Sequence, residues 1–190
     1  MPKPENKSLV KSLREIPISP RGLNYYLPHF KIEETYFDNP NEVIIDMGSG
    51  LKQNLAREVE SRGLRAKVIS VDPSLLDGEH LEDNERKVSG SFHANTVAAF
   101  AERLPFSSNS IDKILVHSSI PYYSISEEIF LVELKEMIRV LKPGGEIRIY
   151  PYPAFSNAQK FNYSAINEKM MKNMEIETVL DRYLLIIKKK

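Results

Sequence analysis

Two acids and two glycines between residues 41 and 72 have the spacing of a nucleoside-binding site. Asp46 lies near the end of an apolar run, Gly48 and Gly50 follow it, and Asp72 ends the next apolar run. Glycine lets the backbone approach a ligand at a point where a Cβ atom would collide with it. A carboxylate at the end of the second strand can accept hydrogen bonds from both hydroxyls of a ribose. The same pattern also fits α/β turns that bind nothing.

A strand–helix–strand unit would bring these residues together. The apolar runs at residues 43–47 and 66–71 predict two buried parallel strands. Between them, Leu51, Leu55 and Val59 recur at the spacing of one helical face. This βαβ unit would place both acids and both glycines at the strand tips.

The remaining chain continues the alternation of strands and helices. Further strands are expected over residues 96–99, 111–116, 146–150, 176–180 and 183–187. Ser124 and Glu127 have capping-box spacing and predict a helix that ends before Pro143, where Gly144-Gly145 turns the chain into the next strand; a second helix is expected over 157–171. The short link around Asp181 makes the last strand pair antiparallel, whereas the earlier crossovers predict parallel pairing.

Residues 1–40 form a segment that is distinct from the domain expected over 41–190. Repeated prolines break it too often for a long helix, yet it carries many aromatic side chains. We expect it to pack on the domain as a lid, with Tyr25, Tyr26 and His29 facing an acceptor pocket. Equally, these aromatics could simply cover the core or the sheet edge.

Composition limits the classes of function. A chain of 190 residues suits one domain, and 26 basic residues balance 26 acidic ones, so nucleic acid is not expected as a partner. The apolar runs are too short to span a bilayer, and the N-terminus lacks the apolar core of a signal peptide, so a cytoplasmic protein without a membrane segment is expected. With no cysteine and no cluster of histidines, no metal is expected.

Three later motifs extend the pattern: Leu104-Pro105-Phe106, Ile111-Asp112 at the start of a strand, and Leu141-Lys142-Pro143-Gly144-Gly145. In order and spacing, the chain from about Glu42 onward resembles the class I S-adenosylmethionine-dependent methyltransferases, of the small type with LPF and LKPGG motifs. The resemblance implies a doubly wound, Rossmann-like α/β fold with helices on both faces. Its sheet would have seven strands, mostly parallel, in the order 3-2-1-4-5-7-6 with strand 7 antiparallel.

The resemblance also implies a set of site residues. The expected S-adenosylmethionine contacts are Asp46, Gly48, Gly50, Asp72, Pro73, Phe100, Ala101, Glu102 and His117. The expected acceptor contacts are Tyr25, Tyr26, His29, Ser119 and Tyr122. His117 is the candidate general base, because it ends a strand and histidine has a reference pKa near ~6.5. A structural histidine at a strand end is the alternative.

Three departures from the family pattern keep other functions open. Lys52 stands where a third glycine is common, Phe100 where an acid often accepts from adenine, and Ser119 where rRNA adenine dimethylases have asparagine. The leading hypothesis is methyl transfer to a small-molecule acceptor. The alternative is a catalytically impaired binding or scaffold protein, and methylation of an RNA amino nitrogen is weaker. An NAD-dependent oxidoreductase is disfavoured by Gln53, where a glycine would be required. A homo-oligomer or a partner subunit stays open.

Overall fold

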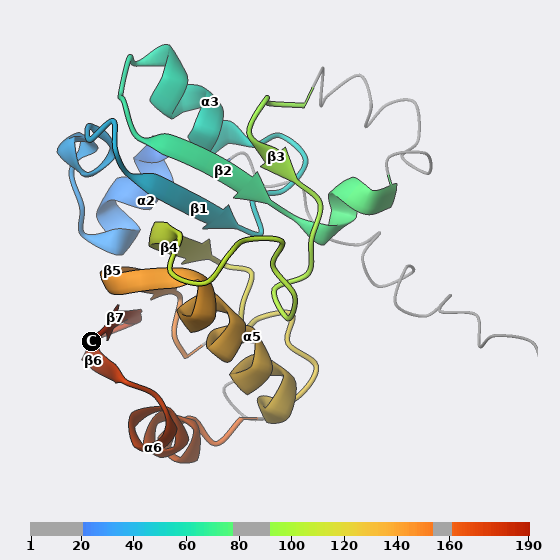
Figure 1. The fold of residues 1–190 in the computed structure, drawn as a ribbon, viewed down its shortest axis with the longest axis vertical. Coiled ribbons are helices and arrows are strands. Elements are labelled where there is room, and N and C mark those ends of the chain that lie inside the picture. The colour runs from blue at the N-terminus through green and yellow to red at the C-terminus, as the bar shows by residue number, and fades with distance from the viewer. Residues whose placement is uncertain (1–20, 78–91, 154–160) are drawn as a thin grey trace, which may run out of the picture.

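The computed structural model describes residues 21–77, 92–153 and 161–190, and seven strands form one sheet in the order β3-β2-β1-β4-β5-β7-β6 (Figure 1). The helical elements are α2 (Leu23–Phe30), η1 (Glu34–Phe37), α3 (Asn54–Ser61), η2 (Pro73–Asp77), α5 (Glu127–Val140) and α6 (Tyr163–Asn173). The strands are β1 (Val43–Met47), β2 (Lys67–Val71), β3 (Thr96–Val97), β4 (Ile111–His117), β5 (Leu141–Tyr150), β6 (Ile176–Asp181) and β7 (Leu184–Lys189).

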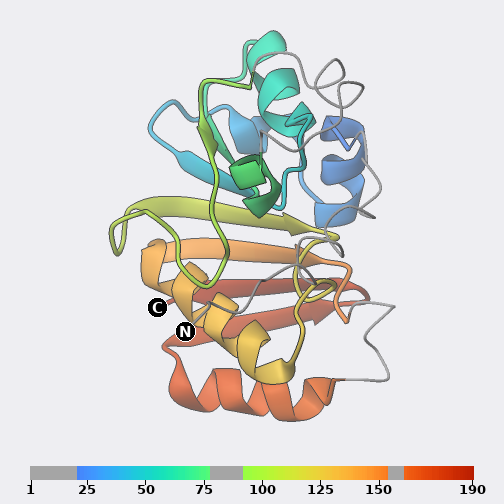
Figure 2. The same cartoon turned by 90° about the vertical axis from the view of Figure 1, so that its right-hand side faces the viewer.

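Strand directions follow from the connections. β1 pairs in parallel with β2 and β4, β2 pairs in parallel with β3, and β4 pairs in parallel with β5. β7 runs antiparallel to both β5 and β6, since only a short link joins it to β6. Figure 2 shows α6 beside the β6–β7 end of the sheet. The predicted fold class and strand order are confirmed.

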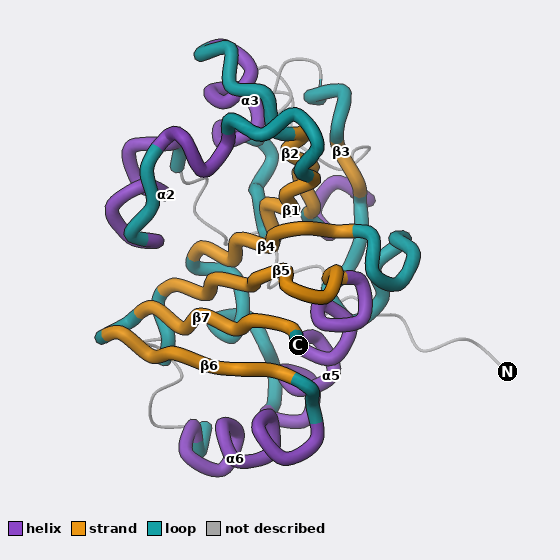
Figure 3. The backbone as a smooth tube through the Cα atoms, turned by 60° about the vertical axis from the view of Figure 1, so that its left-hand side comes forward, coloured by secondary structure: helices purple, strands orange, loops and turns teal. Residues whose placement is uncertain are grey.

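Alternation along the central strands creates two cores. On one face, Ile44 and Leu115 pack with the buried residues of α2 and α3. On the other face, Ile45, Ile114 and Val116 pack with α5 and α6. Figure 3 shows α2 and α5 on opposite sides of the sheet. Because both faces are covered, the central strands are almost continuously apolar.

The described part of the N-terminal segment contributes to the first core. Tyr26 and Phe30, on one face of α2, are buried, whereas Tyr25 on the other face is exposed. Phe37 of η1 is also buried. Residues 1–20 lie outside the described residues, so the lid stays a prediction. Aromatic coverage of the core, its alternative, does occur at α2.

Two local predictions are wrong. The N-cap of α5 is Ser126, whose hydroxyl accepts from the Ile129 amide, and not Ser124. Ser124 is buried and donates its hydroxyl hydrogen to Glu133 at 2.5 Å, so it forms no capping box.

The second wrong prediction concerns the start of β5. This strand begins at Leu141, so Gly144-Gly145 lies within it, at a register irregularity in the pairing with β4. A Cβ atom at Gly145 would lie 2.7 Å from the Asp112 carbonyl oxygen, which explains the glycine there by close strand contact. The other boundaries differ modestly: β3 ends at Val97, and β6 and β7 extend to Asp181 and Lys189. The helix expected over 157–171 corresponds to α6, although residues 157–160 lie outside the described residues.

Candidate functional site

The two glycines after β1 have different roles. Both have left-handed φ angles, 74° at Gly48 and 67° at Gly50. A Cβ at Gly48 would lie 2.3 Å from the Ser119 Cβ, so Gly48 permits contact with the loop after β4. Among the described residues, no atom lies within 4 Å of the corresponding position at Gly50. Gly50 therefore leaves open space of the kind that a bound ligand needs.

Asp72, directly after β2, is oriented by its own loops. One carboxylate oxygen accepts from the Gly50 amide at 2.8 Å, and the other accepts from the Ser74 amide at 2.9 Å and from the Ser74 hydroxyl. A carboxylate has about four acceptor positions, so these three contacts leave room for another donor. The one remaining position can accept from a single ribose hydroxyl, so the predicted contact with both hydroxyls stays a prediction. Pro73, the next residue, begins η2.

Asp46 is buried beneath α2. Tyr26 donates its hydroxyl hydrogen to Asp46 at 2.5 Å. Burial raises the pKa of Asp46 to about 7, the charge of Asp72 adds to that rise, and the Tyr26 hydrogen bond and Arg21 oppose it. The contact predicted from sequence, between Asp46 and a cofactor, stays a prediction, because the carboxylate engages α2 in the present arrangement.

His117, the last residue of β4, lies beside two basic side chains. Its Nε2 atom is 2.7 Å from His29 Nδ1, and its Nδ1 atom is 3.3 Å from a guanidinium nitrogen of Arg21 and 3.2 Å from the Ser118 hydroxyl oxygen. Burial, followed by the charges of Arg21 and His29, lowers the pKa of His117 to about 3. His117 is therefore a neutral imidazole at physiological pH.

His29 connects this buried histidine to the surface. Its ring stacks on Tyr150 with a centroid separation of 4.3 Å and an interplanar angle of 10°. The side chain is half-buried, and burial followed by the charge of Arg21 lowers its pKa. The Tyr26 ring lies 5.2 Å from that of His117. Thus α2 brings two of the predicted acceptor residues, Tyr26 and His29, against His117.

The loop after β4 carries the other predicted acceptor residues. Ser119 is buried and donates its hydroxyl hydrogen to the Met47 carbonyl at 2.8 Å, so it ties this loop to the end of β1. Tyr122 is exposed, and its ring meets that of Tyr123 edge-on at 4.7 Å. Tyr123 was not among the residues predicted for the site. Burial and the neighbouring Tyr122 raise its pKa.

The segment 99–102 carries three of the predicted cofactor contacts, Phe100, Ala101 and Glu102. Phe100 is exposed and Ala101 is buried. An exposed ring can stack on a flat ligand. Glu102 lies near Glu133, whose pKa is raised to about 7 by burial, with Glu102 adding to the rise. Adenine contacts in this segment stay a prediction.

Three further residues were missed by sequence reasoning. Buried Gln53 donates to the Thr96 hydroxyl oxygen at 2.7 Å and accepts from the His93 amide at 2.7 Å, which links the start of α3 to β3. Its φ is 53°, so the third left-handed residue of this loop is Gln53, not Lys52. Arg21 and Tyr150 were also missed. A lone cation next to a run of aromatics was the available signal for Arg21.

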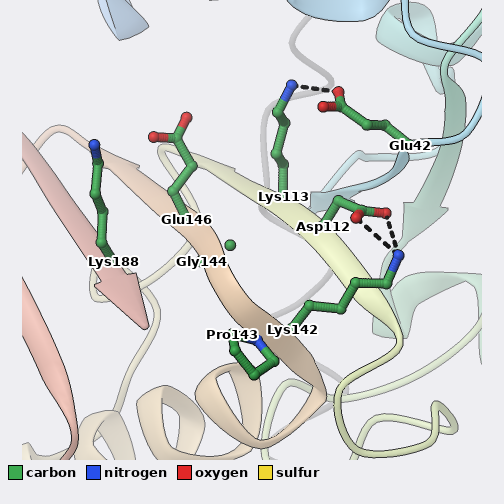
Figure 4. Close-up of a pocket in the computed structure, with 9 residues that line it drawn as sticks. Glu42, Asp112, Lys113, Lys142, Pro143, Gly144, Glu146 and Lys188 are labelled. Atoms are coloured by element: carbon green, nitrogen blue, oxygen red, sulfur yellow. Dashed lines mark hydrogen bonds and ion pairs between the residues drawn. The ribbon is translucent and has the colours of Figure 1, made fainter. Parts of the chain in front are cut away.

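A polar cavity of about 390 Å³ lies at the other end of the central strands, where β1, β4 and β5 begin (Figure 4). Its lysines face acids: Lys142 lies 2.8 and 2.9 Å from the two carboxylate oxygens of Asp112, and Lys113 pairs with Glu42. These residues begin β1, β4 and β5, whereas Asp46 and His117 lie near the far ends of their strands. The LKPGG motif thus contributes to this charged cluster and not to the candidate site.

The described residues, 21–77, 92–153 and 161–190, lack two kinds of feature. None of their helices combines the length and apolarity required to cross a membrane. Within the same ranges, no group of three or more histidine, aspartate or glutamate side chains has the geometry to hold a metal ion.

Comparison with known proteins identifies the family of the chain. Residues 45–149 match the model of a family described as "Methyltransferase domain". The chain is 31% identical over 128 residues to the mitochondrial 2-methoxy-6-polyprenyl-1,4-benzoquinol methylase of Caenorhabditis elegans, covering 66% of this chain and 43% of that protein. It is 32% identical over 116 residues to the ubiquinone/menaquinone biosynthesis C-methyltransferase of Geotalea daltonii, covering 60% and 46%. The chain thus spans less than half the length of these curated relatives.

A solved structure shows the same fold at lower identity. It is a SAM-dependent methyltransferase from Aquifex aeolicus, 16% identical, with a TM-score of 0.51 and coverage of 95% of both chains. At that identity the likeness supports the fold alone. The family match, in contrast, covers more than half of the chain, and it includes the glycine loop, Asp72 and His117. This protein therefore belongs to the methyltransferase domain family, and the cofactor that this membership indicates is S-adenosylmethionine.

Proposed function

We propose that this chain transfers a methyl group from S-adenosylmethionine to a small-molecule acceptor at the tips of β1, β2 and β4. The observation that carries the proposal is the arrangement of Asp72 and Gly50: a carboxylate held in place by backbone amides stands beside a glycine that leaves open space. Ligands bind outside the carboxyl ends of strands in open α/β sheets, next to the point where strand order reverses.

The protein's contribution would be mainly binding and alignment. When bound, S-adenosylmethionine supplies a methyl group that is already activated on a sulfonium sulfur. Asp72 would hold the ribose, and the backbone at Gly48 and Gly50 would pass close to the methionine part. Alignment of acceptor and donor, together with exclusion of water, accounts for much of the acceleration in such a reaction.

The proposed acceptor is an aromatic molecule of quinol type. Both curated relatives carry names that assign them to quinone or quinol methylation. The exposed rings of Tyr25, Tyr122 and Tyr123 support an aromatic acceptor, because aromatic pairs are favourable beyond the area they bury. Ser119 would contribute by fixing the loop that carries the two tyrosines, since its hydroxyl is engaged with Met47.

Isothermal titration calorimetry tests the cofactor part of the proposal. S-adenosylhomocysteine should bind the wild-type protein, and Asp72→Ala should weaken binding by about 1–3 kcal/mol through loss of charge-assisted hydrogen bonds. Asp38→Ala is the matched control, because Asp38 is an exposed acid that pairs with Arg65 on the surface. Equal affinity in wild type and Asp72→Ala would refute the assigned ribose contact.

The methyl-transfer assay should use hydroquinones and the radiolabelled cofactor. Binding of the cofactor without turnover of any acceptor would favour the second candidate, a binding or scaffold protein. That candidate is supported by the engagement of Asp46 with Tyr26 and of both His117 nitrogens with other side chains. The proposed lid over residues 1–40, the role of His117 as a base, and a partner subunit or homo-oligomer are further parts of the proposal that these assays leave as predictions.

A further inference from the structure

Arg21, His117 and His29 form a row of hydrogen bonds with a defined direction. A guanidinium can only donate, so the His117 Nδ1 atom that faces Arg21 at 3.3 Å must accept. The proton of neutral His117 then lies on Nε2, which donates to His29 Nδ1 at 2.7 Å. Neutral His29 must in turn carry its proton on Nε2. One arginine therefore determines the tautomers of both histidines.

The surroundings of His29 keep it neutral and leave one nitrogen available. The groups that face the pair are Arg21 before α2, Tyr25 and Tyr26 of α2, Ser118 after β4, and Tyr150 of β5. The Ser118 hydroxyl can donate or accept, so it does not itself set the tautomer of His117. Asp46 of β1 lies behind Tyr26 and is engaged by its hydroxyl. No side chain within the described ranges makes a hydrogen bond to His29 Nε2. The half-buried ring thus offers an N–H donor close to a fixed positive charge.

We propose that Arg21 and His117 hold His29 as a neutral imidazole whose Nε2–H donates a hydrogen bond to an oxyanion of the acceptor, such as a phenolate or an enolate. This inference rests on the proposed function and specifies the acceptor class for the same site. His117 acts here as a positioning residue, because it reaches the acceptor through His29. Electrostatic stabilisation by such preorganised donors favours a negatively charged oxygen over a neutral one.

The tautomers can be measured without cofactor or acceptor. Long-range proton–nitrogen NMR spectra of the full chain at pH 7, with the ring nitrogens labelled, should show both His29 and His117 neutral and protonated on Nε2. Arg21→Met should remove the preference at His117 and raise the pKa of both histidines, since the charge of Arg21 lowers both. A proton on Nδ1 of either ring in the wild type, or an unchanged spectrum in Arg21→Met, would overturn the inference.

The ligand class is tested with 4-nitrophenol, whose ionisation is visible in its absorbance. In the presence of S-adenosylhomocysteine, bound 4-nitrophenol should show a pKa lowered by about one unit, as expected for a phenolate near a donor and a cation. His29→Ala should abolish this shift. His29→Gln, whose amide can place an N–H near the position of Nε2, should restore part of it. His93→Ala, which removes a histidine paired with Glu60 elsewhere, is the matched control and should keep the full shift.

These outcomes are separate from those of the proposed function. If S-adenosylhomocysteine binds but 4-nitrophenol shows no shift, or the same shift in His29→Ala, the acceptor class is refuted while the cofactor site stands. If S-adenosylhomocysteine fails to bind, the proposed function falls, and the NMR result still decides whether Arg21 sets the histidine tautomers.

Discussion

At the scale of single residues, Gly48 and Gly50 differ in what surrounds them. Both adopt φ angles that favour glycine, but only at Gly48 would an added Cβ atom collide with another side chain. Burial has a similarly local effect on charge at His117 and Asp46, which lie in one cluster. It lowers the pKa of His117 and raises the pKa of Asp46, so the histidine resists protonation and the acid resists ionisation.

We expect Gly48→Ala to destabilise the protein more than Gly50→Ala. Each alanine incurs left-handed strain of roughly 1 kcal/mol, and Gly48→Ala adds a collision with the buried Ser119 that costs about 1–3 kcal/mol. Urea denaturation measures both free energies of unfolding. Equal losses would show that the loop after β4 moves aside at little cost.

Replacing His117 with glutamine should change how stability depends on pH. The folded-state pKa of about 3 lies below that of an unfolded histidine near ~6.5, so the contribution of His117 is present above pH 6.5 and is lost as pH falls toward 3. Between pH 6.5 and 5, the wild type should lose roughly 2 kcal/mol relative to His117→Gln. Thermal or urea unfolding at both pH values gives this difference.

Comparison with the variant is essential, because Asp46 has a raised pKa and contributes a slope of opposite sign in part of the same range. His93→Gln serves as the control. The prediction fails if the two unfolding free energies keep a constant difference from pH 6.5 to 5.

At the scale of elements, α2 is fixed to the sheet by apolar packing and by polar contacts, of which the one between Tyr26 and Asp46 is buried. Tyr26 contributes to both, since its ring lies in the first core and its hydroxyl donates to Asp46 at the end of β1. The position of α2 determines where His29 lies, and therefore what stands over His117.

Tyr26→Phe should destabilise the protein more at pH 8 than at pH 5.5. The pKa of Asp46 is about 7 in the folded protein and near 3.8 for an unperturbed aspartate, so its stabilising contribution exists below pH 3.8 and is lost as pH rises through 7. Loss of the donor leaves a buried carboxylate unsatisfied at pH 8, at a cost of about 1–3 kcal/mol. Urea denaturation at the two pH values is the measurement, and an equal loss at both would contradict the ionised state assigned to Asp46.

The sequence predicted most elements because local patterns decide them. Apolar runs locate β1, β2 and β4, and the helical stripe locates α5. The confirmed fold and cofactor class came from such patterns together with the family resemblance. The predicted start of α5 was wrong because Ser124 donates to buried Glu133, nine residues later. The capping rule considers only residues within one turn of the helix start, so it does not include this contact.

The side-chain arrangement of the site needed the structure. His29 and His117 are 88 residues apart, and their contact depends on how α2 packs on the end of the sheet. Tyr26 and His29 were predicted as residues facing an acceptor, but Tyr26 is fixed by a hydrogen bond to Asp46 and His29 by one to His117. Neither pairing has a signature in sequence spacing.

At the scale of the whole molecule, the two ends of the parallel strands carry different groups of side chains. The carboxyl ends of β1, β2 and β4 carry the candidate site, whereas the amino ends of β1, β4 and β5 carry a cluster of paired acids and lysines (Figure 4). Strands of five to seven residues at about 3.3 Å per residue separate the two ends by roughly 13–20 Å.

Asp112→Ala should therefore reduce stability and leave cofactor affinity unchanged. The variant removes the pair with Lys142 and the hydrogen bond that the Asp112 carboxylate accepts from the Val43 amide at 2.9 Å. Because the pair is partly exposed, the expected loss is about 1–2 kcal/mol in urea denaturation. Titration with S-adenosylhomocysteine supplies the second measurement, and a weakened affinity would show that the two ends are coupled.

Because Gly48 and Ser119 are in contact, the effect of a substitution at one position depends on the residue at the other. With glycine at 119, the nearest remaining atom to a new Cβ at 48 would be the Cα of residue 119, at an ordinary contact distance of 3.7 Å. Glycine at 119 would thus remove the collision with a Cβ at 48, whereas the left-handed strain at 48 would stay. Substitutions at the two sites should consequently be non-additive, with the second rescuing part of the first, and related sequences should vary there in a compensating way.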